Sequence, residues 1–124
     1  MAPIIIRAAA TLIEWELIKG ADNDLVLPVL DSADQPVDMA GWTGKAQIRR
    51  SAVEPVLHEW TTEGANPNAE IDGTELMLHV VGSVTSTWGW TDAQVSVEVT
   101  EPAPSGRVHV IAVGTIRARQ EITQ

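Results

Sequence analysis

The chain has 124 residues, which is enough for one domain with its own core and does not call for a second. It contains no cysteine, which excludes disulfides, thiolate metal sites and a thiol nucleophile. Its formal net charge is −9 with only eight Lys and Arg residues, and this argues against a nucleic-acid partner, because such binding needs clustered cations.

The N-terminal stretch is apolar, but Arg7 and Glu14 interrupt it, so we expect neither a signal peptide nor a membrane span. Ile4, Ile5 and Ile6 favour extended structure, whereas the alanines that follow also suit an amphipathic helix. We interpret residues 1–11 as an extended arm and residues 12–124 as a single domain, made in the cytoplasm.

Short turn-forming segments divide the domain into strands. In Leu25–Leu30, Pro28 indicates an edge position or a bulge, because proline has no N–H for a central ladder. Gly82–Trp88 is predicted to hold one helical turn, capped by a Ser or Thr side chain. Alternating apolar and polar residues predict the strands Leu12–Ile18, Leu25–Leu30, Gly44–Arg50, Val56–Thr62, Glu75–Val81, Ala93–Thr100 and Arg107–Arg119.

The last two strands carry the clearest pattern. Val95, Val97 and Val99 alternate with polar residues, and Glu101–Gly106 supplies the Pro and Gly of a turn, so the pair is predicted to form an antiparallel hairpin. About seven short strands without a long helix indicate an all-β, antiparallel β-sandwich.

Candidate catalytic or metal-binding residues carry little signal. The acidic residues of the first turns offer oxygen ligands for Ca²⁺, but turn formation explains them equally well, because Asp side chains accept hydrogen bonds from nearby backbone amides. Three His residues lie on predicted strands, with no spacing that forces a zinc site. The sequence also has no Gly-x-Ser-x-Gly elbow and no phosphate loop. We therefore assign no catalytic, cofactor or metal residue and do not expect an enzyme.

The chain has five Trp and neither Phe nor Tyr. The interpretation we favour is that Trp42, Trp88 and Trp90 fill the core and make subunit contacts. The alternative is a stacking platform for sugars, which predicts that Trp42, Trp88 or Trp90 is exposed and changes its fluorescence on addition of glycans.

The order of the motifs resembles the small immunoglobulin-like β-sandwich proteins of tailed bacteriophages, including minor tail proteins and N-terminal domains of upper baseplate proteins. The matching segments are Gly20-x-Asp-x-Asp-Leu-x-Leu27, Asp31-x-x-Asp-x-Pro-Val-Asp-Met-x-Gly-Trp-x-x-Lys-Ala-Gln-Ile-Arg49, Trp88-Gly-Trp-x-x-Ala-x-Val-x-Val-Glu-Val-Thr100 and Val113-Gly-Thr-Ile-x-Ala-x-Gln-Glu-Ile-Thr123. The chain departs from the pattern at Gln94 and Ser96, where the family usually has an aromatic pair, and in the longer arm Pro3–Ala10.

The resemblance implies a non-enzymatic component of the virion, in the tail tip, baseplate or neck. Its partners would be other phage structural proteins and copies of itself in a symmetric homo-oligomer, with no nucleic acid and no membrane. The predicted partner-interface residues are Ile4, Ile5, Ile6, Trp42, Trp88 and Trp90. A capsid decoration protein and a carbohydrate-binding module for host attachment are the alternatives.

Overall fold

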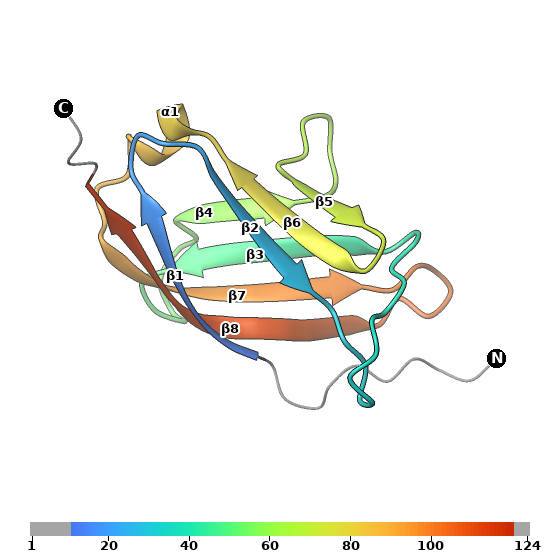
Figure 1. Cartoon of the computed structure of the whole chain (residues 1–124). Coiled ribbons are helices and arrows are strands. Elements are labelled where there is room, and N and C mark those ends of the chain that lie inside the picture. The colour runs from blue at the N-terminus through green and yellow to red at the C-terminus, as the bar shows by residue number, and fades with distance from the viewer. Residues whose placement is uncertain (1–10, 121–124) are drawn as a thin grey trace.

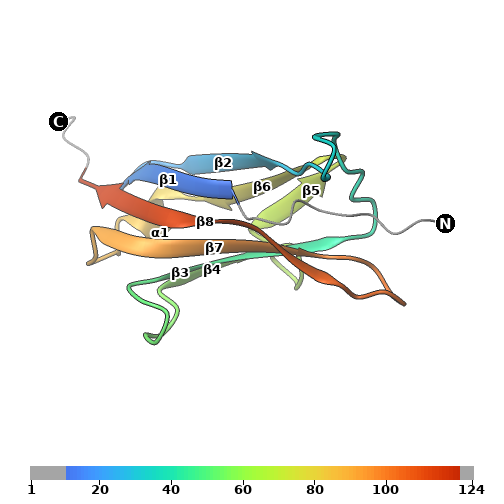
Figure 2. The same ribbon diagram turned by 90° about the horizontal axis from the view of Figure 1, so that it is seen from below.

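The computed structural model describes residues 11–120, which form two facing β-sheets (Figures 1 and 2). The five-stranded sheet has the order β1-β8-β7-β3-β4, and the three-stranded sheet has the order β2-β6-β5. One short helix, α1, connects the sheets between β6 and β7. The elements are β1 (Thr11–Ile18), β2 (Asn23–Pro28), β3 (Thr43–Arg49), β4 (His58–Thr61), β5 (Ala69–Asp72), β6 (Glu75–Val80), α1 (Gly82–Thr85), β7 (Asp92–Thr100) and β8 (Val108–Arg119).

The strand order confirms the predicted immunoglobulin-like β-sandwich. The second, sixth and fifth strands form one sheet, and the third, seventh and eighth form the centre of the other, as the B, E, D and C, F, G strands do in that fold. The first strand joins the larger sheet by pairing with the last, from Thr11 opposite Ala112 to Ile18 opposite Arg119. This pairing is parallel, so the prediction of a wholly antiparallel sandwich is corrected at this edge.

Two details of the prediction also change. Residues 11–120 contain eight strands instead of seven, because Ala69–Asp72 forms a hairpin with β6 through Gly73, whose φ is +62°. The helical turn forms at Gly82–Thr85, but its N-cap is Val81, which has no capping side-chain hydrogen bond. The Asp22 carboxylate accepts a hydrogen bond from the Gly82 N–H instead, at 2.7 Å, so a distant turn satisfies this helix end.

The core lies between the sheets and follows the predicted alternation. Val95, Val97 and Val99 of β7 are all buried, and the buried Ile48 and Ala46 of the neighbouring strand β3 lie beside Val95 and Val97. Pro28 lies on β2, an edge strand, as its missing N–H predicted. Among residues 11–120, no helix is long and apolar enough to span a membrane.

Candidate interaction surface

The predicted interface residues fall into two groups. Ile4, Ile5 and Ile6 lie outside the described residues. Trp42 and Trp90 belong to the buried core, and Trp88 is half-buried and packs against it. Two of the three Trp residues named for a sugar platform are therefore buried, and only Trp88 presents surface to solvent.

Trp88 and Trp90 belong to an aromatic cluster at the α1 end of the sandwich. Their rings stack with centroids 4.8 Å apart, and the ring of His58 lies 5.3 Å from Trp88 and 4.6 Å from Trp60. Burial lowers the pKa of His58, against a smaller opposing effect of the Glu59 charge, so the imidazole is held neutral. The cluster closes this end of the core.

Trp42 lies near the β7–β8 hairpin and stacks on His109, with ring centroids 5.9 Å apart. His109 Nε2 lies 2.7 Å from a carboxylate oxygen of Glu101, and the hydrogen bond with His109 is the main cause of the lowered pKa of Glu101. Trp42 therefore links the β7–β8 hairpin to the core through His109.

The acidic turn residues bind backbone amides. Asp31 Oδ1 accepts hydrogen bonds from the N–H groups of Ala33 and Gln35, and Asp38 Oδ1 accepts one from Ala40. Together with the contact of Asp22 to Gly82, these bonds agree with the interpretation that the acidic residues of the first turns serve to form those turns. In the part of the chain that the structure describes, no group of three His, Cys, Asp or Glu side chains is placed to hold a metal ion.

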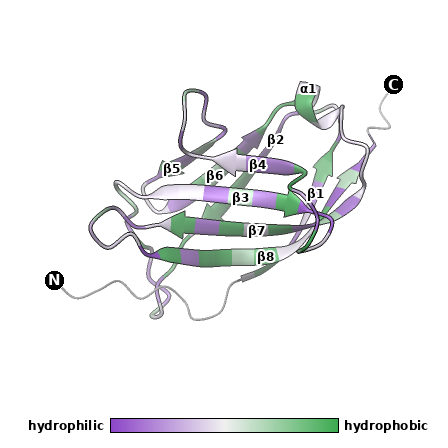
Figure 3. Cartoon of the chain, turned by 180° about the vertical axis from the view of Figure 1, so that it is seen from behind, coloured by the Kyte–Doolittle hydropathy of each residue, from purple (hydrophilic) through white to green (hydrophobic). Residues whose placement is uncertain are grey.

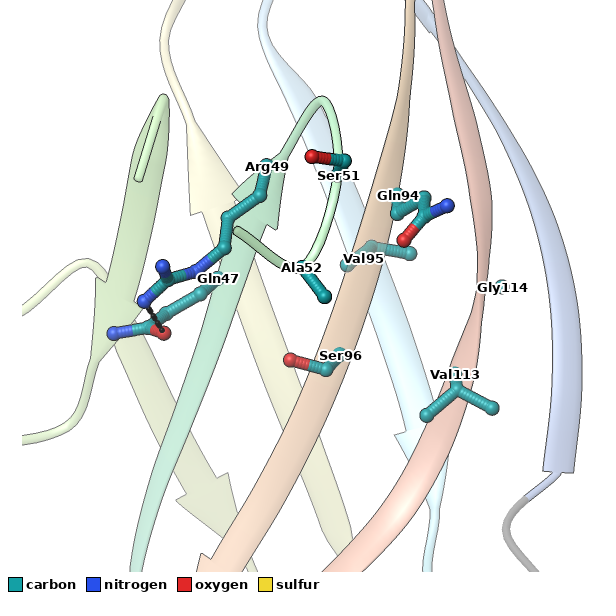
Figure 4. Close-up of a pocket in the computed structure, with 9 residues that line it drawn as sticks. All are labelled: Gln47, Arg49, Ser51, Ala52, Gln94, Val95, Ser96, Val113 and Gly114. Carbon is teal, nitrogen blue, oxygen red and sulfur yellow. Dashed lines mark hydrogen bonds between the residues drawn. The ribbon is translucent and has the colours of Figure 1, made fainter. Parts of the chain in front are cut away.

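A hollow of about 320 Å³ lies on the outer face of the five-stranded sheet (Figure 4). The Ser51–Ala52 loop lies on one side of it and β8 on the other, and Arg49 donates a hydrogen bond to Gln47 at its β3 wall. Gln94 and Ser96 of β7 line it between these two sides. Ser96 has a small side chain and Gly114 has none, which leaves this space open.

An apolar strip borders this hollow along β8. Val108 and Val110 are 57% and 49% exposed and point outward, beside the outward-facing Thr100 and Glu98 of β7. Leu12 of β1, which is 82% exposed, extends the strip opposite Val113. In Figure 3 the first half of β8 is mostly green, whereas much of β3 is white or purple. We call Leu12, Val108, Val110 and Val113 the β8 strip.

The β8 strip adjoins an open stretch of strand edge. β1 pairs with β8 only from Ala112 onward, so within residues 11–120 no strand pairs with Val108–Ile111 on that side. A β-bulge interrupts the β7–β8 ladder at Val97/Glu98, where Ile111 has no partner on β7. The sequence of β8 predicts the strand but not this edge, because the length of its overlap with β1 is set by residues about a hundred positions away.

A different arrangement lies on the outer face of the three-stranded sheet. His79 of β6 contacts Asp24 of β2 through Nδ1, at 2.8 Å, and Glu70 of β5 through Nε2, at 3.1 Å. The hydrogen bond to Asp24 is the main cause that raises the pKa of His79, and Glu70 adds to it. The protonated imidazole thus ties all three strands of this sheet together.

We expect this contact to make stability depend on pH. Because the pKa of His79 is raised on folding, its contribution is fully present below the unfolded value of 6.5 and is lost as pH rises through the folded pKa. His79→Gln should therefore lower the free energy of unfolding more near pH 5.5 than near pH 8.5. The difference should be less than about 1 kcal/mol, since these side chains are exposed. Urea unfolding of both proteins across this range measures the difference, and a cost that grows with pH would contradict the assignment.

No protein-family model and no curated protein sequence matches the chain.

Proposed function

We propose that this protein is a non-enzymatic structural component of a phage virion, a minor tail, baseplate or tail-tip protein that acts through contacts between subunits. The observation that carries the proposal is the β8 strip beside an open strand edge. Natural sheets protect their edges against pairing with other chains, so an unprotected apolar edge is typical of a site that another chain covers.

The other strand edges of the sandwich are protected. β1 carries Glu14 and Glu16, and β4 is short and carries Glu59. On the smaller sheet, β2 contains Pro28 and β5 is a short strand. Within residues 11–120 these edges are protected and Val108–Ile111 is not, which supports a specific contact at this edge over nonspecific association.

The resemblance to phage tail and baseplate proteins supplies the setting. It covers the chain from about Leu12 onward and rests on turns and strands that shape the fold, so it points to an architectural role and not to a reaction. A position on the head, as a capsid decoration protein, would use the same sandwich and differs in location. A sugar-binding site would have to use Trp88, because Trp42 and Trp90 lie in the core.

The proposal is tested on phage particles purified from a culture that expresses the gene. We expect peptide mass spectrometry to find the protein at a fixed copy number per particle, and gold-labelled antibodies to mark the tail tip or baseplate. Label on the head would establish the decoration alternative instead. Purified particles that lack the protein, while other virion proteins are recovered, would contradict the proposal.

A further inference from the structure

We infer that the open edge of β8 at Val108–Ile111 accepts a strand from a second copy of this chain, and that the strand comes from the apolar segment around Ile4–Ile6. The inference rests on the proposed assembly function and names the surface and the partner through which it would act. It combines three observations: the chemistry of the edge, the bend in β8, and the composition of the chain before Thr11.

The edge brings little charge to an added backbone, because its one titratable side chain, His109, already contacts the Glu101 carboxylate. The four residues Val108–Ile111 include no carboxylate, Lys, Arg or Pro, and their backbone groups on the side away from β7 pair with no strand in residues 11–120. An added strand would complete this ladder through main-chain hydrogen bonds and would cover Val108 and Val110. The exposed Leu12 lies where the added strand would meet β1.

The bend in β8 favours an occupant from another copy. A bulge bends its strand and increases the local twist, and the bulge at Val97/Glu98 lies directly before the residue where β1 starts to pair. Figure 2 shows β8 descending away from the layer of β1 over its first half. A strand from a neighbouring copy can approach along this bent edge.

The composition of the chain indicates which segment fits. The net charge is −9, so most surface segments would bring carboxylates to this edge. Ile4, Ile5 and Ile6 are an uncharged run of β-branched residues, which favour strands and whose apolar side chains match the β8 strip. Backbone pairing would supply affinity, and the isoleucine–valine contacts would set the register.

Charge placed on the edge tests the site. We expect Val110→Lys to raise the concentration at which the protein self-associates by at least tenfold, measured by light scattering over a dilution series. The matched control is Val26→Lys on β2, which also lies on an edge strand and is 47% exposed, compared with 49% for Val110. The control should self-associate within twofold of the unmodified protein. Unchanged far-UV circular dichroism would show that both variants are folded.

Thiol cross-linking tests the occupant, and the absence of native cysteines makes every thiol an introduced one. An Ile5→Cys protein mixed with a Val110→Cys protein should form a disulfide-linked pair under mild oxidation. The same mixture with Val26→Cys in place of Val110→Cys should not. In a doubly substituted protein at high dilution, intrachain linkage between positions 5 and 110 would overturn the inference in favour of pairing within one chain.

Other outcomes also separate the inference from the proposed function. If the unmodified protein is monomeric at all concentrations, if only Val110→Cys pairs with itself, or if no cross-link forms, the inference is overturned. The protein would still be a virion component if purified particles contain it. If the particles lack it but the edge captures the Ile4–Ile6 segment, the inference stands and the phage assignment fails.

Discussion

Trp60→Ala is expected to lower the free energy of unfolding by about 4 kcal/mol, within the range of about 3–5 kcal/mol for removal of a buried Trp side chain. Trp60 is fully buried and is the largest such side chain among the described residues. It lies on β4 of the five-stranded sheet, and its indole N–H donates a hydrogen bond to the carbonyl of His79 on β6, at 3.0 Å. The substitution would therefore leave a cavity and remove a bond between the two sheets.

Two further variants separate these contributions. Trp60→Phe keeps most of the apolar volume but removes the part-buried hydrogen bond to the His79 carbonyl, which should cost about 1 kcal/mol. Trp88→Ala removes an indole that is only half-buried and should cost less than Trp60→Ala. Urea unfolding followed by circular dichroism gives all three values. A loss below about 1 kcal/mol for Trp60→Ala would show that the sheets are held together elsewhere.

The larger sheet could be predicted because its signals are local. Val95, Val97 and Val99 alternate with polar residues, and the Pro and Gly residues that follow end the strand, so both the strand and its hairpin were correctly predicted. Pro28 has no N–H, which predicted an edge position or a bulge, and it lies on the edge strand β2. Each of these features follows from a few neighbouring residues and needs no knowledge of distant contacts.

The features that remained hidden depend on distant pairs. The parallel pairing of β1 with β8 joins segments about a hundred residues apart, and nothing within Thr11–Ile18 specifies its direction. The helix N-terminus takes its partner from Asp22, sixty residues earlier, where the sequence predicted a local Ser or Thr cap. Which part of β8 pairs with β1 depends on the register between these distant strands, in which Thr11 lies opposite Ala112, so the candidate site could not be located from the sequence of β8 alone.

Gly114 shows how one residue permits the parallel pairing. An ideal Cβ placed on Gly114 would lie 1.8 Å from the carbonyl oxygen of Ile13 and 2.8 Å from its carbonyl carbon. These are backbone atoms of β1, held by pairing along the whole of Thr11–Ile18, so they cannot rotate away as the end of a flexible side chain could. A close approach of another backbone is a common reason for a glycine inside a strand.

We expect Gly114→Ala to destabilise the protein by about 3 kcal/mol, the upper end of the usual range for overpacking, because β1 must move for the methyl group to fit. The melting temperature should fall by about 10 °C in a domain of this size. Hydrogen exchange should quicken in β1 around Ile13, where the backbone is displaced, more than in the β3–β7 ladder.

The matched control is Gly89→Ala. A Cβ on Gly89 would have no atom within 4 Å, and its φ is not in the left-handed region, so we expect a change within about 0.5 kcal/mol. If both substitutions have equally small effects, β1 is not held against β8 at Gly114 in solution. If only Gly114→Ala loosens β1, the parallel pairing of β1 with β8 depends on this glycine.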